Sequence, residues 1–284
     1  MIPTFVIFLR EGVEASMIIA ILLAYLSRIG QRRHFRDVFL GVGAAFVLVA
    51  GGGVAAYVLI SQWDGSTAQT IFETVTYLVA VAALTYMTFW MKRHARSLTG
   101  ELQRRSDEAL TSGSRVGLGV LSFQAVGREG LETMVFTLAI VFASNRQAGA
   151  PLHGRWLLLG AVLGLATALV IAFVIYKLGH RMNLGRFFSV LGVLLMFFAA
   201  GLLADAVENL QSLGWLPVLE HTLWNTSRTL SEDSSLGDVL HSFFGYAEQP
   251  SLLQVLAWAG YLAVGLTVYL RRPRTPRSLA APPA

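Results

Sequence analysis

Long apolar runs separated by short polar segments dominate the chain. A helix that crosses a hydrocarbon layer of about 30 Å needs about 20 apolar residues. The fourth run is too long for one straight crossing, which predicts a tilted helix, an amphipathic lead-in, or a break near Gly127 or Gly130. We therefore expect an all-α, polytopic membrane protein with one transmembrane domain, residues 1–270. Its seven predicted spans are about 4–27, 38–61, 71–91, 116–143, 156–176, 187–204 and 252–270.

The composition supports a membrane protein and excludes several other classes. Of the 284 residues, 55% are hydrophobic and 14% are charged, whereas about 25% are charged in soluble domains. The net charge of +5 does not indicate a nucleic-acid partner, because the basic residues form short clusters between apolar runs. The chain has no cysteine, so a metal site would need oxygen or imidazole ligands.

The basic clusters predict the orientation in the membrane. The connections at 28–37, 92–115 and 177–186 and the tail 271–284 carry 17 Lys and Arg residues, and the alternate connections carry three. The positive-inside rule then places the N-terminus outside and the C-terminus in the cytoplasm, as in a multi-pass protein of the cytoplasmic (inner) membrane. The acidic segment 205–251 is then predicted to be extracytoplasmic, and it is either a solvated loop, or a vestibule that attracts cations or a docking surface for a donor protein.

Two segments repeat each other and carry charges inside predicted spans. "FLREGVEASMIIAIL" (8–22) aligns with "VGREGLETMVFTLAI" (126–140) at an offset of 118, and both contain Arg-Glu-Gly-x-Glu. This predicts half-repeats of about 4–91 and 116–204 followed by an added seventh helix. Because each half crosses three times, the halves are predicted to be inverted, an organisation that places substrate near the midplane in many secondary transporters.

The repeated motif predicts a cation site. On a helix, Arg10, Glu11 and Glu14 project from neighbouring turns toward one side, and each such charge costs about 2.5–3.5 kcal/mol at the membrane centre unless it is paired or hydrated. Together the two motifs have a net charge of −2, and carboxylates prefer hard ions. Helix packing by Arg–Glu pairs is the alternative. We expect Arg10 and Arg128 to be fixed charge partners, and the predicted metal ligands are Glu11, Glu14, Glu129 and Glu132.

Two membrane motifs of this kind, in the first and fourth of seven spans, resemble the oxidase-dependent iron permease family, and the bare permease is similar to its bacterial EfeU-type branch. The resemblance implies high-affinity iron uptake that needs both glutamates of each motif. It also implies delivery by an extracytoplasmic oxidase, peroxidase or iron-binding donor protein. We expect ferric iron as the transported substrate, no permanently bound cofactor and no enzymatic activity.

Other functions are compatible with parts of the pattern. Ligand type alone also allows ferrous iron, lead or manganese. A glutamate-dependent intramembrane enzyme would need a deep histidine or another nucleophile, and the predicted spans lack one. A membrane subunit without transport activity is a third alternative.

Residues outside the motifs give weaker predictions. Glu73, Asp205 and Glu208 lie near outer span ends, where they either line a path of cation access or are solvated helix ends. His221 and His241 are candidate metal ligands of the outer loop. Packing or the interfacial aromatic belt is the role expected for the aromatic residues of the third span, Tyr77, Tyr86, Phe89 and Trp90.

Overall fold

The computed structural model describes residues 1–63, 65–94, 104, 108, 117–145, 153–178, 184–232 and 234–271. The basic connections 92–115 and 177–186 and the tail 271–284 lie largely outside these residues. In the described part the chain is helical, and an isolated bridge joins Thr222 to Ser251. The α-helices are α1 (Ile2–Arg28), α2 (Phe35–Ser61), α3 (Thr67–His94), α5 (Gly117–Asn145), α6 (His153–Leu178), α7 (Leu184–Ser212), α8 (Ser235–Phe244) and α9 (Leu252–Leu270), with a 3-10 turn at Arg32–His34.

Each of the seven predicted spans coincides with a long helix. Among the described residues, five helices, α2, α3, α6, α7 and α9, are long and apolar enough to cross a membrane. α1 and α5 are of similar length but carry the charged motifs in their middle. α5 is continuous through Gly127 and Gly130, so the break suggested there is absent. The structure is thus that of an all-helical, polytopic membrane protein.

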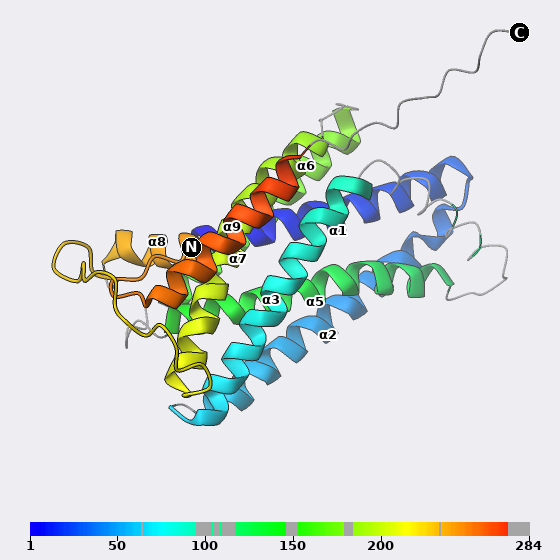
Figure 1. Cartoon of the computed structure of the whole chain (residues 1–284). Coiled ribbons are helices and arrows are strands. Elements are labelled where there is room, and N and C mark those ends of the chain that lie inside the picture. The colour runs from blue at the N-terminus through cyan, green and yellow to red at the C-terminus, as the bar shows by residue number, and fades with distance from the viewer. Residues whose placement is uncertain are drawn as a thin grey trace, which may run out of the picture.

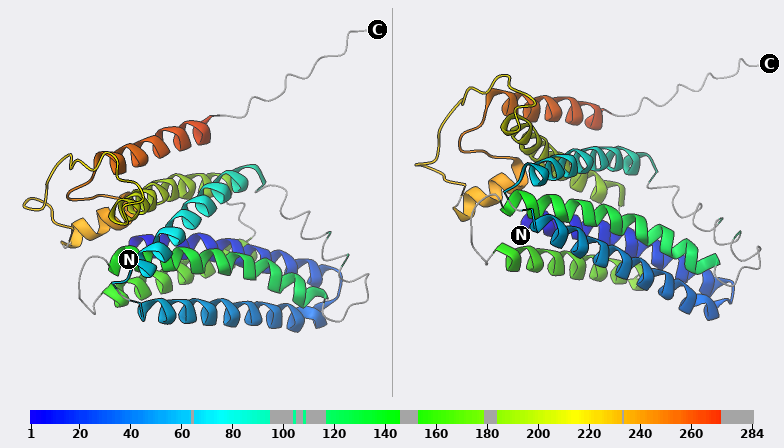
Figure 2. Two further views of the ribbon diagram at one scale, coloured as in Figure 1. Left: turned by 60° about the horizontal axis from the view of Figure 1, so that its bottom comes forward. Right: turned by 90° about the horizontal axis from the view of Figure 1, so that it is seen from below.

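The long helices form two layers. One layer contains α6, α1, α5 and α2 in that order, because α1 packs against α6 and α5, and α5 packs against α2. The other contains α3, α7 and α9, with α7 packed against both neighbours. Figure 2 shows the first layer below the second in its left view.

The two ends of the bundle differ in charge. The N-terminus, α8 and the segment 213–251 lie at one end, and α1 meets α2 at the other (Figures 1 and 2). We call the first the acidic end, after Glu208, Glu220, Glu232 and Glu248. The second is the basic end, after Arg28, Arg32, Arg33 and Arg36.

The predicted duplication agrees with both helix boundaries and packing. Shifted by 118, α2 (35–61) becomes 153–179 and α3 (67–94) becomes 185–212, which are the bounds of α6 and α7 within one residue. Exchanging the halves converts the α1–α6 contact into the α5–α2 contact, and both are major interfaces. The helices alternate in direction along the chain, so α1 and α5 run in opposite directions (Figure 2).

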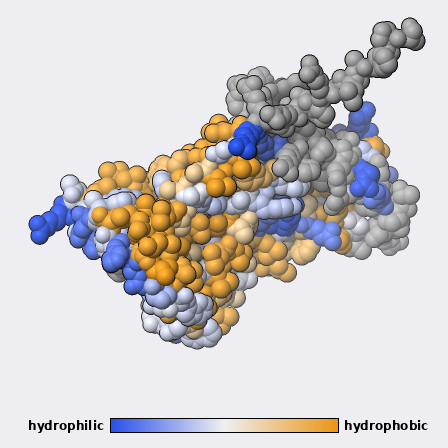
Figure 3. Space-filling model, viewed as in Figure 1, coloured by the Kyte–Doolittle hydropathy of each residue, from blue (hydrophilic) through white to orange (hydrophobic). Residues whose placement is uncertain are grey.

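The exposed surface is largely apolar where helices would face lipid. Val47 on α2 and Leu158 on α6 are examples of large hydrophobic side chains that are mostly exposed. Figure 3 shows apolar side chains over much of the middle of one face, with polar ones gathered at the end near α8. An exposed apolar belt of this kind suits a hydrocarbon environment.

α8 closes the acidic end of the bundle. Ser234 caps its N-terminus by accepting a hydrogen bond from the Gly237 amide at 3.0 Å. Gly245 ends it with φ +69°, and a Cβ added at Gly201 of α7 would lie 2.9 Å from the Gly245 backbone. Only glycine allows this left-handed cap to lie directly on α7. α8 therefore packs on α7 and also contacts α1 and α5.

Candidate metal centre

The glycine of each motif allows its helix to approach a helix of the other half. A Cβ at Gly12 of α1 would lie 2.8 Å from the Cβ of Ala168 on α6. A Cβ at Gly130 of α5 would lie 3.0 Å from Val49 Cγ2 on α2. The motif glycines thus serve the same packing purpose in both halves, and close packing of small residues is a common way to join membrane helices.

The motif glutamates meet where α1 and α5 pack together. One carboxylate oxygen from each of Glu11, Glu14 and Glu129 lies within 4.8 Å of the other two, and all three residues are buried. Oxygens on opposite sides of a bound cation stand roughly 4–5 Å apart, since metal–oxygen distances are about 2.0–2.6 Å. Small side-chain rotations would bring these three oxygens onto one ion. We call this group the carboxylate cluster.

Arg10 balances part of the negative charge. Its Nη1 donates to Glu11 Oε1 at 2.6 Å, and its Nη2 lies 3.4 Å from Glu14 Oε1. Arginine remains charged in proteins, so it is a fixed counter-charge to these glutamates. Arg10 also lies within electrostatic range of Glu129 and Glu132.

Each of the four motif glutamates keeps one buried carboxylate oxygen without a hydrogen bond. These oxygens are Glu11 Oε2, Glu14 Oε1, Glu129 Oε2 and Glu132 Oε2. A buried acceptor without a partner costs about 1–3 kcal/mol, and more when it is charged. A cation bound among them would satisfy this demand, so the residues present fit a hard metal ion.

The second motif is arranged differently from the first. Arg128 Nε donates to Glu132 Oε1 at 3.1 Å, and the Arg128 side chain is 45% exposed, compared with 3% for Arg10. Glu132 stands outside the carboxylate cluster but within electrostatic range of Glu11 and Glu14. The structure therefore brings three of the four predicted ligands together and leaves Glu132 beside its arginine.

Trp90 contacts a motif arginine, which the sequence interpretation did not predict. We expected packing, yet its ring centroid lies 5.2 Å from the guanidinium carbon of Arg128, within cation–π distance. The aromatic run of the third span gave no reason to single it out. The repeat gives one signal for this position. With the offset of 118, Trp90 aligns with Glu208, so this position holds a residue that can contact an arginine in both halves.

Glu73 and Glu208, two of the weaker predictions, lie at the acidic end, outside the cluster. Glu73 is buried on α3, and its Oε1 accepts a hydrogen bond from Gln69 at 2.9 Å. Glu208 is exposed on α7 and accepts from Gln254 of α9 at 3.2 Å. α7 continues to Ser212, so Glu208 and Asp205 belong to a helix instead of the predicted loop.

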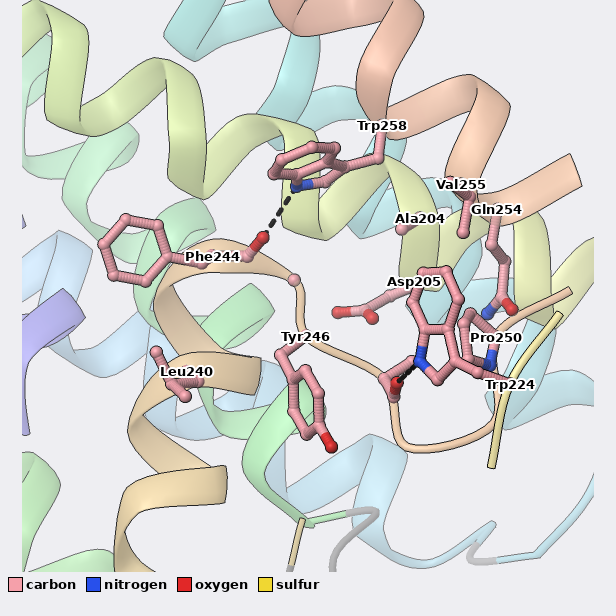
Figure 4. A pocket seen from close by; sticks show the side chains of 12 residues that line it. Ala204, Asp205, Trp224, Leu240, Phe244, Tyr246, Pro250, Gln254, Val255 and Trp258 are labelled. Atoms are coloured by element: carbon pink, nitrogen blue, oxygen red, sulfur yellow. Dashed lines mark hydrogen bonds between the residues drawn. The ribbon is translucent and has the colours of Figure 1, made fainter. Parts of the chain in front are cut away.

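Asp205 lies in a pocket of about 320 Å³ at the acidic end. Its carboxylate points into this pocket, whose other lining residues include Trp224, Tyr246 and Trp258 (Figure 4). The two indoles are held by hydrogen bonds to the carbonyls of Ala247 and Phe244. The pocket thus combines aromatic walls with one buried carboxylate.

His241 connects α8 to its surroundings. Its Nδ1 lies 2.7 Å from the Tyr246 carbonyl oxygen, and its Nε2 lies 3.9 Å from Asp205 Oδ1. Burial alone would lower the pKa of His241, but the carboxylates of Asp205 and Glu232 outweigh it and raise that pKa above its ordinary value. His221 is exposed. A metal bound by these histidines stays a prediction.

Comparison with known proteins gives consistent matches along nearly the whole chain. Residues 1–271 match the Iron permease FTR1 family. A protein of Escherichia coli O6:H1 named ferrous iron permease EfeU is 36% identical over 279 residues, covering 96% of this chain and 97% of the relative. The protein of that name from Yersinia pestis is 34% identical over 280 residues, covering 97% and 95%. No solved structure matches the chain.

The matched region contains all seven long helices and both charged motifs. Each of these relatives is covered almost completely, so the similarity concerns a whole permease and not an isolated segment. The sequence resemblance to iron permeases is confirmed. The chain belongs to the iron permease FTR1 family.

Proposed function

We propose that this protein carries iron across the cytoplasmic membrane through the carboxylate cluster of Glu11, Glu14 and Glu129, with Glu132 joining as the ion moves. The observation that carries the proposal is the convergence of three buried carboxylates within 4.8 Å of one another on two helices of a membrane protein. Such charges in a membrane interior are costly and mark ion pathways. Arg10 and Arg128 orient the glutamates and offset their mutual repulsion between transport events.

Ferrous iron is the form we propose for transport. The six charged motif residues sum to −2, which a divalent ion neutralises, and the relatives above are named for ferrous iron. Ferric iron, expected from the hardness of carboxylate ligands, is the second candidate. Manganese and lead satisfy the same charge balance and serve as competitors in the test.

The acidic end is the proposed side of uptake. Asp205 in its pocket, Glu208 and Glu73 would raise the local concentration of cations there. An extracytoplasmic iron-binding donor or oxidase, implied by the family resemblance, would deliver iron at the same end. The basic end would face the cytoplasm, as the positive-inside rule predicts.

Movement of the two halves would carry the ion inward. In transporters with inverted repeats, one repeat rocks against the other around a fixed midplane site. A membrane potential of about 100 mV would contribute about 2.3 kcal/mol for each charge that crosses inward. The motif glutamates come from both halves, so relative motion would change the ligands around the ion.

The proposal is tested by uptake of radioactive iron into cells that lack their own iron transporters. Wild type is compared with Glu14→Gln and Glu132→Gln at matched membrane abundance, with Glu220→Gln as an exposed carboxylate control at the acidic end. Uptake should be abolished by the first two changes and kept by the control. Equal uptake by all variants, or none by wild type, would refute it.

The same cells distinguish the ion. Iron is supplied either with a reductant or as a ferric chelate, and excess manganese or lead is added in parallel. Faster uptake of reduced iron supports the ferrous form, and faster uptake of the chelate supports the ferric form. If the glutamate variants fold normally but lose uptake, the motifs act in transport and are not purely structural.

A further inference from the structure

The two halves share one sequence motif but differ in exposure along the same helical face. On α1 this face contains Val6, Arg10 and Val13, and on α5 the repeat counterparts are Gln124, Arg128 and Leu131. In each helix the three positions follow i, i+4 and i+7 spacing, so they share one side. The comparison therefore concerns equivalent positions on equivalent elements.

The α1 face is closed and the α5 face is open. Val6 and Val13 are 6% and 0% exposed, whereas Leu131 is 47% exposed and Gln124 is also exposed. The open face extends from the motif toward the basic end, where α5 begins. An arginine and a glutamine facing lipid would be costly, about 2.5–3.5 kcal/mol for arginine at the membrane centre. This open face is therefore best explained as facing water.

The third helix of each half shows the same difference. The α3–α7 alignment is supported by burial, because Tyr77, Leu84 and Met87 are buried on α3 and their counterparts on α7 are buried as well. Tyr86, toward the basic end, is 63% exposed, but its counterpart Ala204, toward the acidic end, is 7% exposed. Both views of Figure 2 show α3 and α5 diverging toward the basic end.

In this open arrangement Arg128 reaches Trp90 near the end of α3. The repeat counterpart of Arg128 is Arg10, and the counterpart of Trp90 is Glu208 on α7. Here Arg10 is buried beside Glu11, while Glu208 accepts a hydrogen bond from Gln254 of α9. If the halves exchanged conformations, Arg10 would turn toward the acidic end and meet Glu208.

We propose that the structure is the arrangement open to the basic end, and that Glu208 is a positioning residue which pairs with Arg10 in the opposite arrangement. The proposal rests on the proposed transport function and adds a second state to it. Each arrangement has its own partner for the outward-turned arginine: an aromatic ring at the basic end and a carboxylate at the acidic end. By pairing with Arg10, Glu208 would release Glu11 to the incoming cation, while Glu14 would stay beside Arg10 as Glu132 stays beside Arg128 here.

Cysteine labelling tests the exchange directly, because the chain contains no cysteine. Val6→Cys and Gln124→Cys are made separately in the full-length protein and labelled with a membrane-impermeant maleimide in vesicles of either orientation. Val13→Cys is a second probe of the closed face. The exchange predicts that Gln124→Cys labels from the basic side and that Val6→Cys or Val13→Cys labels from the acidic side.

The role of Glu208 is tested in the same labelling experiment. Glu208→Gln should lower acidic-side labelling of Val6→Cys by about tenfold, equivalent to about 1.4 kcal/mol, and raise basic-side labelling of Gln124→Cys. Glu208→Asp should restore both rates, and Glu220→Gln, at another exposed carboxylate of the acidic end, should change neither. If Glu208 only attracted cations, its replacement would lower iron uptake without changing the labelling rates from the two sides.

Two results would overturn the proposal. Absence of acidic-side labelling at both Val6→Cys and Val13→Cys would mean that α8 closes this end permanently. Labelling rates that are unaffected by Glu208→Gln would show that Glu208 does not position Arg10. Labelling needs no iron, so either result is independent of whether iron uptake is observed.

Discussion

Replacing Glu11 or Glu129 by glutamine should have opposite effects on stability although both changes remove one carboxylate from the same cluster. Glu11 is bonded to Arg10 at 2.6 Å, and both side chains are 3% exposed. Glu129 has no hydrogen bond to an arginine in the described structure, since Arg128 donates to Glu132. The neutral amide therefore breaks a buried ion pair in one case and relieves repulsion in the other.

The magnitudes follow from the geometry. Two unit charges 4.8 Å apart, the outer limit of the cluster, repel by about 3.5 kcal/mol at an effective dielectric constant of about 20. Because Arg10 lies beside the cluster and offsets most of this repulsion, we expect a gain of only about 1 kcal/mol for Glu129→Gln. Breaking a buried ion pair costs about 3–5 kcal/mol. Because Glu14 still faces Arg10, we expect a loss of about 3 kcal/mol for Glu11→Gln.

Thermal unfolding of the purified protein in chelator-containing detergent buffer measures the difference. Relative to wild type, Glu129→Gln should melt a few degrees higher and Glu11→Gln several degrees lower, while radioactive iron uptake is lost in both. Adding iron should raise the melting temperature of wild type but of neither variant. Equal destabilisation by the two changes would show that Glu129 is already neutralised by a partner, and the reasoning would be refuted.

Three further predictions concern packing, pH and the second arginine. Gly12→Ala should destabilise the protein by about 1–3 kcal/mol in thermal unfolding, because its Cβ would clash with α6, whereas Gly43→Ala, in open space on α2, should be neutral or slightly stabilising. The pKa of His241 is raised in the folded state, so the stabilising effect of its charge is complete below the unfolded pKa of about 6.5 and is lost as pH rises through the folded pKa. The difference in melting temperature between wild type and His241→Asn should therefore shrink between pH 6 and 9. A difference that widens would contradict this. Trp90→Leu should release Arg128 toward the glutamates and raise the half-saturating iron concentration for uptake about threefold to tenfold, while Trp90→Tyr keeps a value close to wild type.

The helices could be predicted from the sequence because membrane spans are defined by length and hydropathy alone. The seven apolar runs matched seven helices, and the offset of 118 found in the motif also relates α2 to α6 and α3 to α7. Boundaries were less predictable at polar ends. α7 continues through Asp205 and Glu208 to Ser212. Its last turns bond to the start of α9, where Glu208 accepts from Gln254 and Gln211 accepts from Ser251, and no local sequence pattern reveals these contacts.

That the motif residues of the two halves come close together could also be predicted, but the asymmetry between them could not. The motif predicts the same chemistry in both halves, so Arg10 and Arg128 were expected to be equivalent. In the structure one is buried between two glutamates and the other lies over Trp90. This difference depends on how α3 and α7 pack at the two ends, and tertiary arrangement of that kind is absent from a spacing pattern.

The asymmetry also explains why identical motifs suit a transporter better than a static metal site. A static site would gain most if all four glutamates bound the ion at once, and then both arginines would have equivalent positions. Here three carboxylates converge and the fourth is held aside by Arg128. An exchange of the halves would release Glu132 and engage Arg10 elsewhere, so the ion would always have three close carboxylates but not the same three. With such a change of ligands, neither arrangement would bind the ion so tightly that the ion could not leave, and this is the requirement for passage.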